Sequence, residues 1–227
     1  MSDPSWRGAV LVTGTDTGVG KTWVACGLAR ALTDAGWIVA VRKPAESGCE
    51  LVDGEPFPED AAALRTASGS IEPVEDICAV RLVEALAPGI AAERAGVKID
   101  VDELVRDYRS RAEDLDCLVV EGAGGLLVPL ATGVSYADFG ARIGARLLVV
   151  TAAKLGAINH TLLTLEAAAQ RGLDVIGVVV NHASAEEDLA TQTLTDSLRD
   201  LIDVPILAEI PHGSDPGEHL FVGPSPS

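Results

Sequence analysis

Aromatic side chains are scarce in this chain, and long apolar runs are missing from it. Aromatic residues make up 4% of the 227 residues, so the hydrophobic share of 48% comes mainly from Ala, Val, Leu and Ile. These residues typically fill a parallel sheet that is buried on both faces. No apolar run approaches the roughly 18–20 residues that a bilayer-spanning helix needs, and residues 1–8 lack the apolar segment of a signal peptide. We therefore expect a soluble, cytoplasmic protein.

Basic residues are also few. The chain has 17 Lys and Arg against 34 Asp and Glu, which gives a net charge of −17. A surface this acidic repels nucleic acid and anionic lipid, so we expect neither nucleic acid nor a membrane as a partner. A lysine that lies beside glycines in such a protein indicates a site for an anion.

The cysteine pattern indicates neither a disulfide framework nor a metal site. The four cysteines are Cys26, Cys49, Cys78 and Cys117, and they form no CxxC pair and no Cys/His cluster. We therefore expect free thiols in a reducing compartment.

Short apolar runs alternate with helical patterns along the chain, which predicts an α/β fold of the P-loop NTPase type with one doubly wound, mainly parallel sheet. The expected strands are residues 9–13, 38–42, 117–121, 147–151, 175–181 and 206–210. The expected helices are residues 21–35, 101–112, 136–144, 158–171 and 186–200. The length fits a single domain, residues 1–227. Its tail, residues 212–227, is rich in Gly, Pro and Ser, and we expect it to be poorly ordered.

Chemically informative residues directly follow five of the expected strands. These segments are residues 14–22, 43–48, 121–125, 154–160 and 181–182. Ligands of such sheets bind outside the carboxyl ends of the strands, so these segments are predicted to meet at one edge.

The segment at residues 14–22, GTDTGVGKT, joins a strand to a helix and indicates a phosphate loop. Its glycines let backbone N–H groups surround an anion at the positive end of the following helix. Lys21 is placed to reach the β- and γ-phosphates, and Thr22 to ligate Mg²⁺. The candidate nucleotide-binding residues here are Thr17, Gly18, Val19, Gly20, Lys21 and Thr22. Gly14 precedes Gly20 by six positions instead of the usual five, and the alternative is an ordinary glycine-rich turn with a surface lysine.

Four segments form an ordered set of motifs. They are VTGTDT at residues 12–17 with VGKT at 19–22, KPAESG at 43–48, VEGAGG at 120–125 and KLGAINH at 154–160. In this order they resemble the motifs of the dethiobiotin synthase family. The strings at residues 12–22 are similar to its phosphate loop. Residues 43–48 resemble its KPxxSG substrate loop, residues 120–125 its VEGAGG loop, and residues 154–160 its KLGxINH segment. The similarity covers the chain up to Pro211.

The resemblance implies an ATP-dependent ligase of biotin biosynthesis. Its substrate, 7,8-diaminopelargonate, takes up CO₂ as a carbamate, and ATP phosphorylates the carbamate to a mixed anhydride. The second amine then closes the cyclic urea of dethiobiotin and releases ADP and phosphate. The resemblance also implies a homodimer, with the substrate near the subunit interface.

The catalytic candidates are Lys21, Lys43 and Ser47. Two lysines that converge on one anionic centre suit phosphoryl transfer, because that chemistry depends on positioning and electrostatics. Lys43 alone would be interpreted as an edge lysine, and Ser47 alone as a turn residue. Their place in the resembling loop favours contact with the carbamate and with a substrate nitrogen.

The magnesium candidates are Thr22, Asp60 and Glu121. Glu121 ends an apolar strand, where an unpaired carboxylate would be costly and a metal or a substrate ammonium would satisfy it. A structural ion pair is the alternative, and we favour a direct or water-mediated Mg²⁺ role. Asp60 matches an acidic residue that the resembling family uses for metal, although Glu59-Asp60 is also typical of a helix N-terminus. Together they would form an oxygen-rich Mg²⁺ site that keeps some waters.

The resemblance extends to two further groups of residues. Additional nucleotide-binding candidates are Gly122, Ala123, Gly124, Asn181, His182 and Pro211. Additional substrate-binding candidates are Lys154, Gly156, Ala157, Ile158 and Asn159. Backbone N–H groups of the last four would hold the carboxylate tail across a dimer interface with help from Lys154, and the alternative is an ordinary helix cap. His160 and His182 have no partner at recognisable spacing, and we assign neither as an acid or base.

Two departures from the resembling family concern Gly18, where some relatives carry an acidic residue, and Gly89, where many carry a histidine.

A nucleotide-switch ATPase that acts on a protein partner is the alternative function. Asp16 counts against it, because such ATPases carry an extra lysine at this position of the loop. An amide ligase related to cobyrinate amidation is a third possibility, but those enzymes normally add a glutaminase domain for which 227 residues leave little room.

Overall fold

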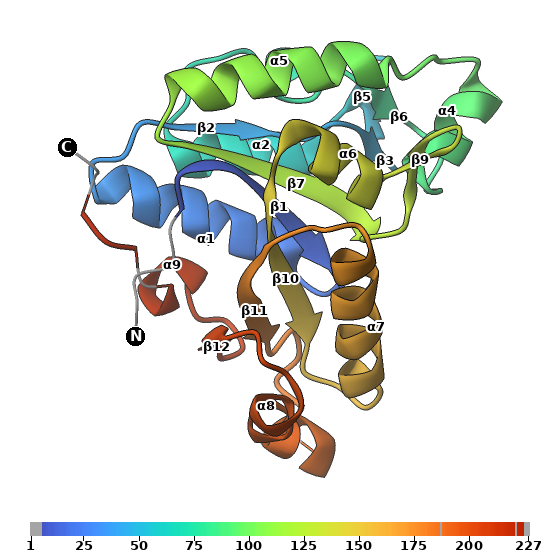
Figure 1. The fold of residues 1–227 in the computed structure, drawn as a ribbon. Helices are drawn as coiled ribbons and strands as arrows, with labels where there is room; N and C mark the ends of the chain where they lie inside the picture. Colours follow the sequence, from blue (N-terminus) through green and yellow to red (C-terminus); the bar gives the residue numbers. More distant parts are fainter. Residues whose placement is uncertain (1–5, 187, 221, 225–227) are drawn as a thin grey trace.

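A computed structural model describes residues 6–186, 188–220 and 222–224. Its centre is a six-stranded parallel sheet with the strand order β12-β11-β10-β1-β7-β2 (Figure 1). The strands are β1 (Gly8–Gly14), β2 (Val39–Arg42), β7 (Cys117–Gly125), β10 (Arg146–Ala152), β11 (Val175–Asn181) and β12 (Ile206–Ile210). The principal helices are α1 (Lys21–Asp34), α5 (Val101–Asp114), α6 (Tyr136–Ile143), α7 (Ala157–Gln170) and α8 (Leu189–Leu201).

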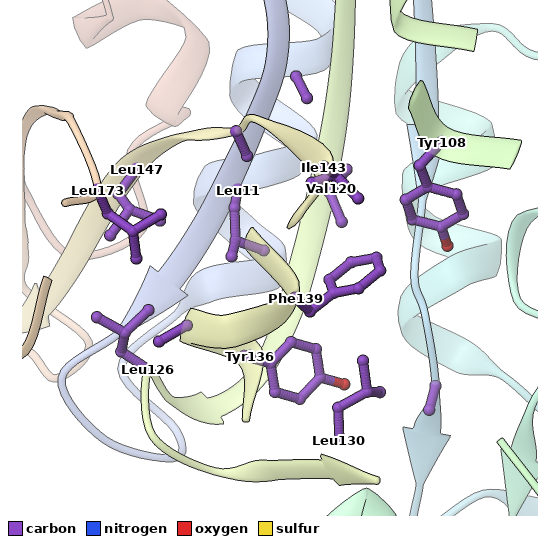
Figure 2. Close-up of a cluster of buried hydrophobic side chains, with 14 of the residues drawn as sticks. Leu11, Tyr108, Val120, Leu126, Leu130, Tyr136, Phe139, Ile143, Leu147 and Leu173 are labelled. Atoms are coloured by element: carbon purple, nitrogen blue, oxygen red, sulfur yellow. The ribbon is translucent and has the colours of Figure 1, made fainter. Parts of the chain in front are cut away.

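Two apolar layers cover the two faces of the sheet. Along β1, Leu11 contributes to one layer, whereas Val10 and Val12 contribute to the other, because successive strand side chains point to opposite faces. Helices α5, α6 and α7 pack on the face of Leu11, and α1 packs on the opposite face. On the first face, the rings of Tyr108 from α5 and Phe139 from α6 meet edge to face with centroids 5.5 Å apart (Figure 2). Burial on both sides explains why the strands are almost continuously apolar.

The predicted fold class is confirmed, and each expected strand and helix is present. Strand β7 is longer than expected, because residues past Glu121 keep pairing with β1 up to the contact of Gly125 with Gly14. Helix α8 begins later than expected, since Asp188 and Thr191 form a capping box at its start. No helix in the described ranges is long and apolar enough to cross a membrane.

The segment between β2 and α5 forms short elements that the sequence patterns did not indicate. They are β3 (Glu46–Ser47), β4 (Glu50–Val52), β5 (Glu55–Phe57), α2 (Glu59–Ser68), α3 (Val74–Ile77), β6 (Arg81–Leu82) and α4 (Pro88–Ala95). Elements of two to four residues are too short to show a hydrophobic period. Strand β3 pairs with β6, β4 pairs with β5, and α2 packs beside α1 on the second face of the sheet. Two more short strands, β8 (Pro129–Ala131) and β9 (Val134–Ser135), follow β7.

The tail that the sequence predicts to be poorly ordered returns to α1. Its short helix α9 (Pro216–His219) lies so close to Gly27 that a Cβ atom there would approach the Pro216 side chain to 2.6 Å. Arg30 forms an ion pair with Asp215, and the indole N–H of Trp37 donates a hydrogen bond of 2.9 Å to the carbonyl of Gly223. Residues 221 and 225–227 of this tail lie outside the described residues.

Candidate active site

A cavity of about 600 Å³ opens at the carboxyl ends of β1, β7 and β2. The predicted site residues that line it are Thr17, Gly18, Gly20, Lys21, Thr22, Lys43, Ser47, Asp60, Glu121, Ala123 and Gly124. The structure thus brings the phosphate loop, the loop after β2 and the end of β7 together at one edge of the sheet, as the βα topology predicts.

The phosphate loop turns through two glycines with positive φ, at 73° for Gly18 and 93° for Gly20. Gly20 is the N-cap of α1, so the positive end of that helix faces the cavity. A Cβ atom on Gly20 would lie 2.2 Å from Nδ2 of Asn181. Asn181 is buried, and its Nδ2 donates a hydrogen bond of 2.9 Å to the carbonyl of Val19. The side chain of Asn181 therefore supports the loop from behind, and one of its two amide hydrogens is already used there.

Lys21 and Lys43 both line the cavity and both are buried, with exposed fractions of 7% and 3%. The Lys21 ammonium donates to the carbonyl of Asp16 at 3.3 Å, and burial lowers the pKa of Lys21. Burial alone would also lower the pKa of Lys43, but its two carboxylate neighbours raise that pKa above the ordinary value. Lys43 Nζ lies 2.7 Å from Glu121 Oε1 and 2.6 Å from Asp60 Oδ2. The two carboxylates therefore favour the charged form of Lys43.

The carboxylates of Asp60 and Glu121 and the hydroxyl of Thr22 form a compact oxygen cluster. Thr22 Oγ1 lies 2.9 Å from Asp60 Oδ1 and 2.7 Å from Glu121 Oε1. Glu121 is 1% exposed, burial raises its pKa, and its Oε2 atom has no hydrogen-bond partner in the part of the chain that the structure describes. Burial would also raise the pKa of Asp60, but the Lys43 ammonium holds it below its usual value.

This oxygen cluster fits a magnesium ion. Carboxylate and hydroxyl oxygens are the donors that Mg²⁺ prefers, and the orphaned Oε2 of Glu121 is a buried acceptor in need of a cation. Two carboxylates are fewer than an all-protein cage would need, and within the described residues no group of three or more His, Cys, Asp or Glu side chains is close enough to hold a metal. Mg²⁺ usually keeps several waters and binds through one or two carboxylates plus phosphates, which agrees with this count.

One wall of the cavity was not predicted from the sequence. It comprises Glu46, Ala85, Leu86, Ala87, Pro88 and Val128. Ser47 is tied to this wall, because its hydroxyl donates a hydrogen bond of 2.7 Å to the carbonyl of Leu86. Glu46 is 7% exposed, and burial raises its pKa. It stands inside the KPxxSG string, at a position that the resemblance leaves unspecified.

The structure gives a reason for the glycine at position 89. Helix α4 packs against β8 so closely that a Cβ atom on Gly89 would lie 3.1 Å from the carbonyl oxygen of Pro129 and 3.2 Å from the backbone of Ala131. A histidine at position 89 would require α4 or β8 to move.

Five predicted substrate-binding residues lie outside the cavity lining. They are Lys154, Gly156, Ala157, Ile158 and Asn159. Lys154 Nζ lies 3.2 Å from Asp16 Oδ2, so it contacts the phosphate loop from the side of β10. The other four form the N-cap and first turn of α7. Of the remaining candidates, Val19 and Gly122 are buried beneath the loops; a Cβ atom on Gly122 would lie 3.4 Å from the ring of Tyr136.

A second cavity of about 470 Å³ lies beyond the ends of β11 and β12. It is lined by two of the nucleotide-binding candidates, His182 and Pro211, together with Ser184, Ala185, Glu209 and His212. The Nε2 atom of His182 lies 2.9 Å from Glu209 Oε1. Asn181, which directly precedes His182, links this cavity to the phosphate loop through its bond to Val19.

Comparisons with known proteins agree with this architecture. Residues 8–218 match a protein family described as an AAA domain. Among solved structures, the septum site-determining protein MinD of Pyrococcus horikoshii superimposes with a TM-score of 0.56 at 18% identity, covering 94% of this chain and 86% of that chain. A ParA family ATPase of Chlorobium tepidum gives a TM-score of 0.56 at 16% identity, covering 92% and 86%. At these identities the likeness establishes the P-loop α/β fold alone.

Curated relatives share far more of the sequence. The ATP-dependent dethiobiotin synthetase BioD of Anaeromyxobacter dehalogenans strain 2CP-C is 48% identical over 179 residues, which are 79% of this chain and 78% of that protein. The proteins of the same name from Akkermansia muciniphila and Aromatoleum aromaticum are each 38% identical. The match covers 90% of this chain and 92% of the first protein, and 96% of this chain and of the second. With this identity over most of its length, and with the cavity at the expected edge of the sheet, the chain belongs to the ATP-dependent dethiobiotin synthetase family.

Proposed function

We propose that this protein catalyses the ATP-dependent conversion of 7,8-diaminopelargonate and CO₂ to dethiobiotin, with release of ADP and phosphate. The observation that carries the proposal is the convergence of Lys21, Lys43, Thr22, Asp60 and Glu121 on one cavity. Phosphoryl transfer to a carbamate needs cations at the phosphates and at the acceptor, and the cavity offers both next to an oxygen cluster. The protein is accordingly a carbon–nitrogen ligase of biotin biosynthesis.

The phosphate loop would hold the triphosphate through its backbone N–H groups and the ammonium of Lys21. Thr22, Asp60 and Glu121 would hold Mg²⁺, which supplies neutralisation of charge on the β- and γ-phosphates. The Lys43 ammonium lies between the two carboxylates that we assign to Mg²⁺, which supports a position for it beside the transferred phosphoryl group. We assign Lys43 to stabilising the carbamate and the charge that develops during transfer.

Ser47 and the wall beside it would orient the diamine. Because the Ser47 hydroxyl donates its hydrogen to the carbonyl of Leu86, its lone pairs remain to accept a hydrogen bond from a substrate N–H group. Leu86 and Pro88 provide apolar surface for the hydrocarbon chain of the substrate.

The second cavity would receive the nucleotide base. It adjoins the phosphate loop through Asn181, and its polar edge contains His182, His212 and the backbone near Pro211. Among the described residues, the second amide hydrogen and the oxygen of the Asn181 carboxamide have no hydrogen-bond partner, and both would be available for pairing with a base.

We further propose that the active unit is a homodimer in which the first turn of α7 from one subunit binds the carboxylate tail of substrate held by the other. Within one chain, residues 156–159 lie outside the cavity that contains Lys43 and Ser47. The surface beside them exposes Leu155, Leu162 and Leu163 with exposed fractions of 84%, 37% and 56%. An apolar surface of this kind suits a subunit interface.

The four cysteines are free thiols in the structure, which supports a location in the reducing cytoplasm.

The direct test measures ADP and dethiobiotin formed from diaminopelargonate, bicarbonate and ATP with Mg²⁺. We expect Lys43→Ala to lower kcat by at least about a hundredfold while nucleotide affinity changes little, because its charge acts mainly in the transition state. Lys21→Ala is expected to weaken nucleotide binding as well as turnover, and Lys98→Ala, at an exposed lysine outside the cavity, is the control. ADP release that does not depend on the diamine would end the proposal.

A further inference from the structure

Helix α2 begins without a cap from its own segment. Its N-cap residue is Pro58, which has no polar side chain to accept a hydrogen bond from the first turn. The first backbone N–H groups of a helix have no partner inside the helix and require an acceptor from elsewhere.

Glu46 supplies that acceptor from a different element. Its Oε1 atom accepts the N–H of Asp60 at 3.0 Å, and its Oε2 atom accepts the N–H of Ala61 at 3.1 Å. One carboxylate thus satisfies two adjacent groups at the positive end of α2, where the helix dipole also favours a negative charge. Both oxygens of Glu46 are directed at backbone in this arrangement.

The side chain of Glu46 is itself held in place. Its backbone N–H donates to the carbonyl of Val80 at 2.9 Å, and strand β3 pairs with β6 at this residue. With 7% of the residue exposed, its carboxylate lies at the wall of the cavity, where movement toward solvent would leave the first turn of α2 without its partner. Glu46 is therefore a rigid link between β3 and α2.

The link ends at the candidate metal site. The residue whose N–H is held by Oε1 is Asp60, and the carboxylate of Asp60 lies 2.9 Å from Thr22 Oγ1 and 2.6 Å from Lys43 Nζ. The side chain of Asp60 is 39% exposed, so packing alone restrains it less than it restrains Glu121 at 1%. The bond from the Asp60 N–H to Glu46 therefore restrains the backbone at the base of this side chain.

We propose that Glu46 is a positioning residue for magnesium: by capping α2 it fixes the backbone of Asp60 and so aims the Asp60 carboxylate at Thr22 and Lys43. The inference rests on the proposed function, in which Asp60 holds Mg²⁺. Partners that orient metal ligands affect metal affinity by about tenfold to a hundredfold.

The test measures the melting temperature of the full-length protein during a titration with Mg²⁺ at saturating ADP. Glu46→Gln is the main variant, because a carboxamide offers one acceptor and points a donor at the second N–H. We expect it to raise the Mg²⁺ concentration at half-maximal stabilisation at least tenfold. In turnover assays kcat should fall while the KM for the diamine stays within about twofold of the wild type.

Glu59→Gln is the matched control. Glu59 carries the same charge in the same first turn of α2, but its side chain is exposed. For Glu59→Gln, the Mg²⁺ concentration at half-maximal stabilisation (the Mg²⁺ midpoint) should therefore stay within about twofold of the wild type. Glu46→Asp keeps the charge on a shorter side chain and should give a smaller shift than Glu46→Gln, in the same direction. It carries the test if Glu46→Gln does not fold.

Three results would overturn the inference. In the first, a folded Glu46 variant has an unchanged Mg²⁺ midpoint but a lower melting temperature at every Mg²⁺ concentration. Glu46 would then only stabilise the fold. An unchanged midpoint with a raised KM for the diamine means that Glu46 binds substrate directly. A wild-type protein whose melting temperature does not respond to Mg²⁺ with ADP removes the metal site itself, which is a failure of the proposed function and is recognised before any variant is compared.

Discussion

Replacing Lys43 with methionine tests how the buried carboxylate of Glu121 is tolerated. The substitution removes the ammonium at 2.7 Å but keeps most of the side-chain volume, so the effect reports charge more than packing. Glu121 is 1% exposed, and an unpaired carboxylate there is unfavourable. We therefore expect the free energy of unfolding to fall sharply at pH 7 in the absence of Mg²⁺.

The destabilisation caused by the unpaired Glu121 carboxylate has an upper limit, because Glu121 can lose its charge by taking up a proton. Protonating a carboxyl with an ordinary pKa of 4.5 at pH 7 costs about 3.4 kcal/mol, since each pH unit corresponds to about 1.4 kcal/mol. Protonation thus limits the contribution of the Glu121 charge to the loss to about 3.4 kcal/mol, which is at the low end of the roughly 3–5 kcal/mol typical of breaking a buried ion pair. A carboxyl group whose pKa is raised in the folded state destabilises that state once the pH exceeds its pKa in the unfolded state. The loss of stability in Lys43→Met should therefore grow as the pH rises from about 4.5 to 7.

Urea unfolding followed by circular dichroism in EDTA, at several pH values from 5 to 7, measures this deficit. The double variant that adds Glu121→Gln should recover most of the lost stability, because the neutral pair no longer buries a charge. Mg²⁺ should also restore part of it by replacing the missing cation. A Lys43→Met protein as stable as the wild type at pH 7, or a deficit that is the same at every pH, would refute the electrostatic explanation.

Three further outcomes follow from other contacts. Arg42 is fully buried and donates two hydrogen bonds to Glu72, which holds the pKa of Glu72 below its usual value. Glu72→Gln should therefore cost up to about 3 kcal/mol at neutral pH in urea unfolding. The cost should vanish as the pH falls through the depressed pKa of Glu72, since the wild-type side chain is then neutral, like glutamine. Gly20→Ala should weaken ADP binding at least about tenfold in calorimetry, because its Cβ would displace Asn181 in a backbone conformation that alanine disfavours. Gly27→Ala should lower the melting temperature and increase proteolysis of the tail, because the new methyl group would collide with α9. This is opposite to the usual effect of replacing glycine with alanine inside a helix, which stabilises by about 1 kcal/mol.

The local pattern of residues was enough to predict the sheet and the edge at which the site lies. Parallel strands that are buried on both faces are continuously apolar, and this made the six strands visible along the chain. Right-handed βα connections place the ends of these strands at one edge, so the phosphate loop, the loop of Lys43 and the loop of Glu121 were expected to meet without knowledge of any contact. Lys21 and Lys43 indeed line the same cavity.

The contacts that turn this edge into a site were decided by tertiary structure. Lys43 lies between Asp60 and Glu121, which are 17 and 78 positions away, and no local period connects residues at such separations. The role of Glu46 as a cap for α2 depends on how β3 meets that helix, and the bond from Asn181 to Val19 spans 162 positions. A sequence specifies which loops share an edge through the geometry of βα units. Which side chain reaches which atom across that edge depends on the packing of short irregular segments, and these carry no repeating signal.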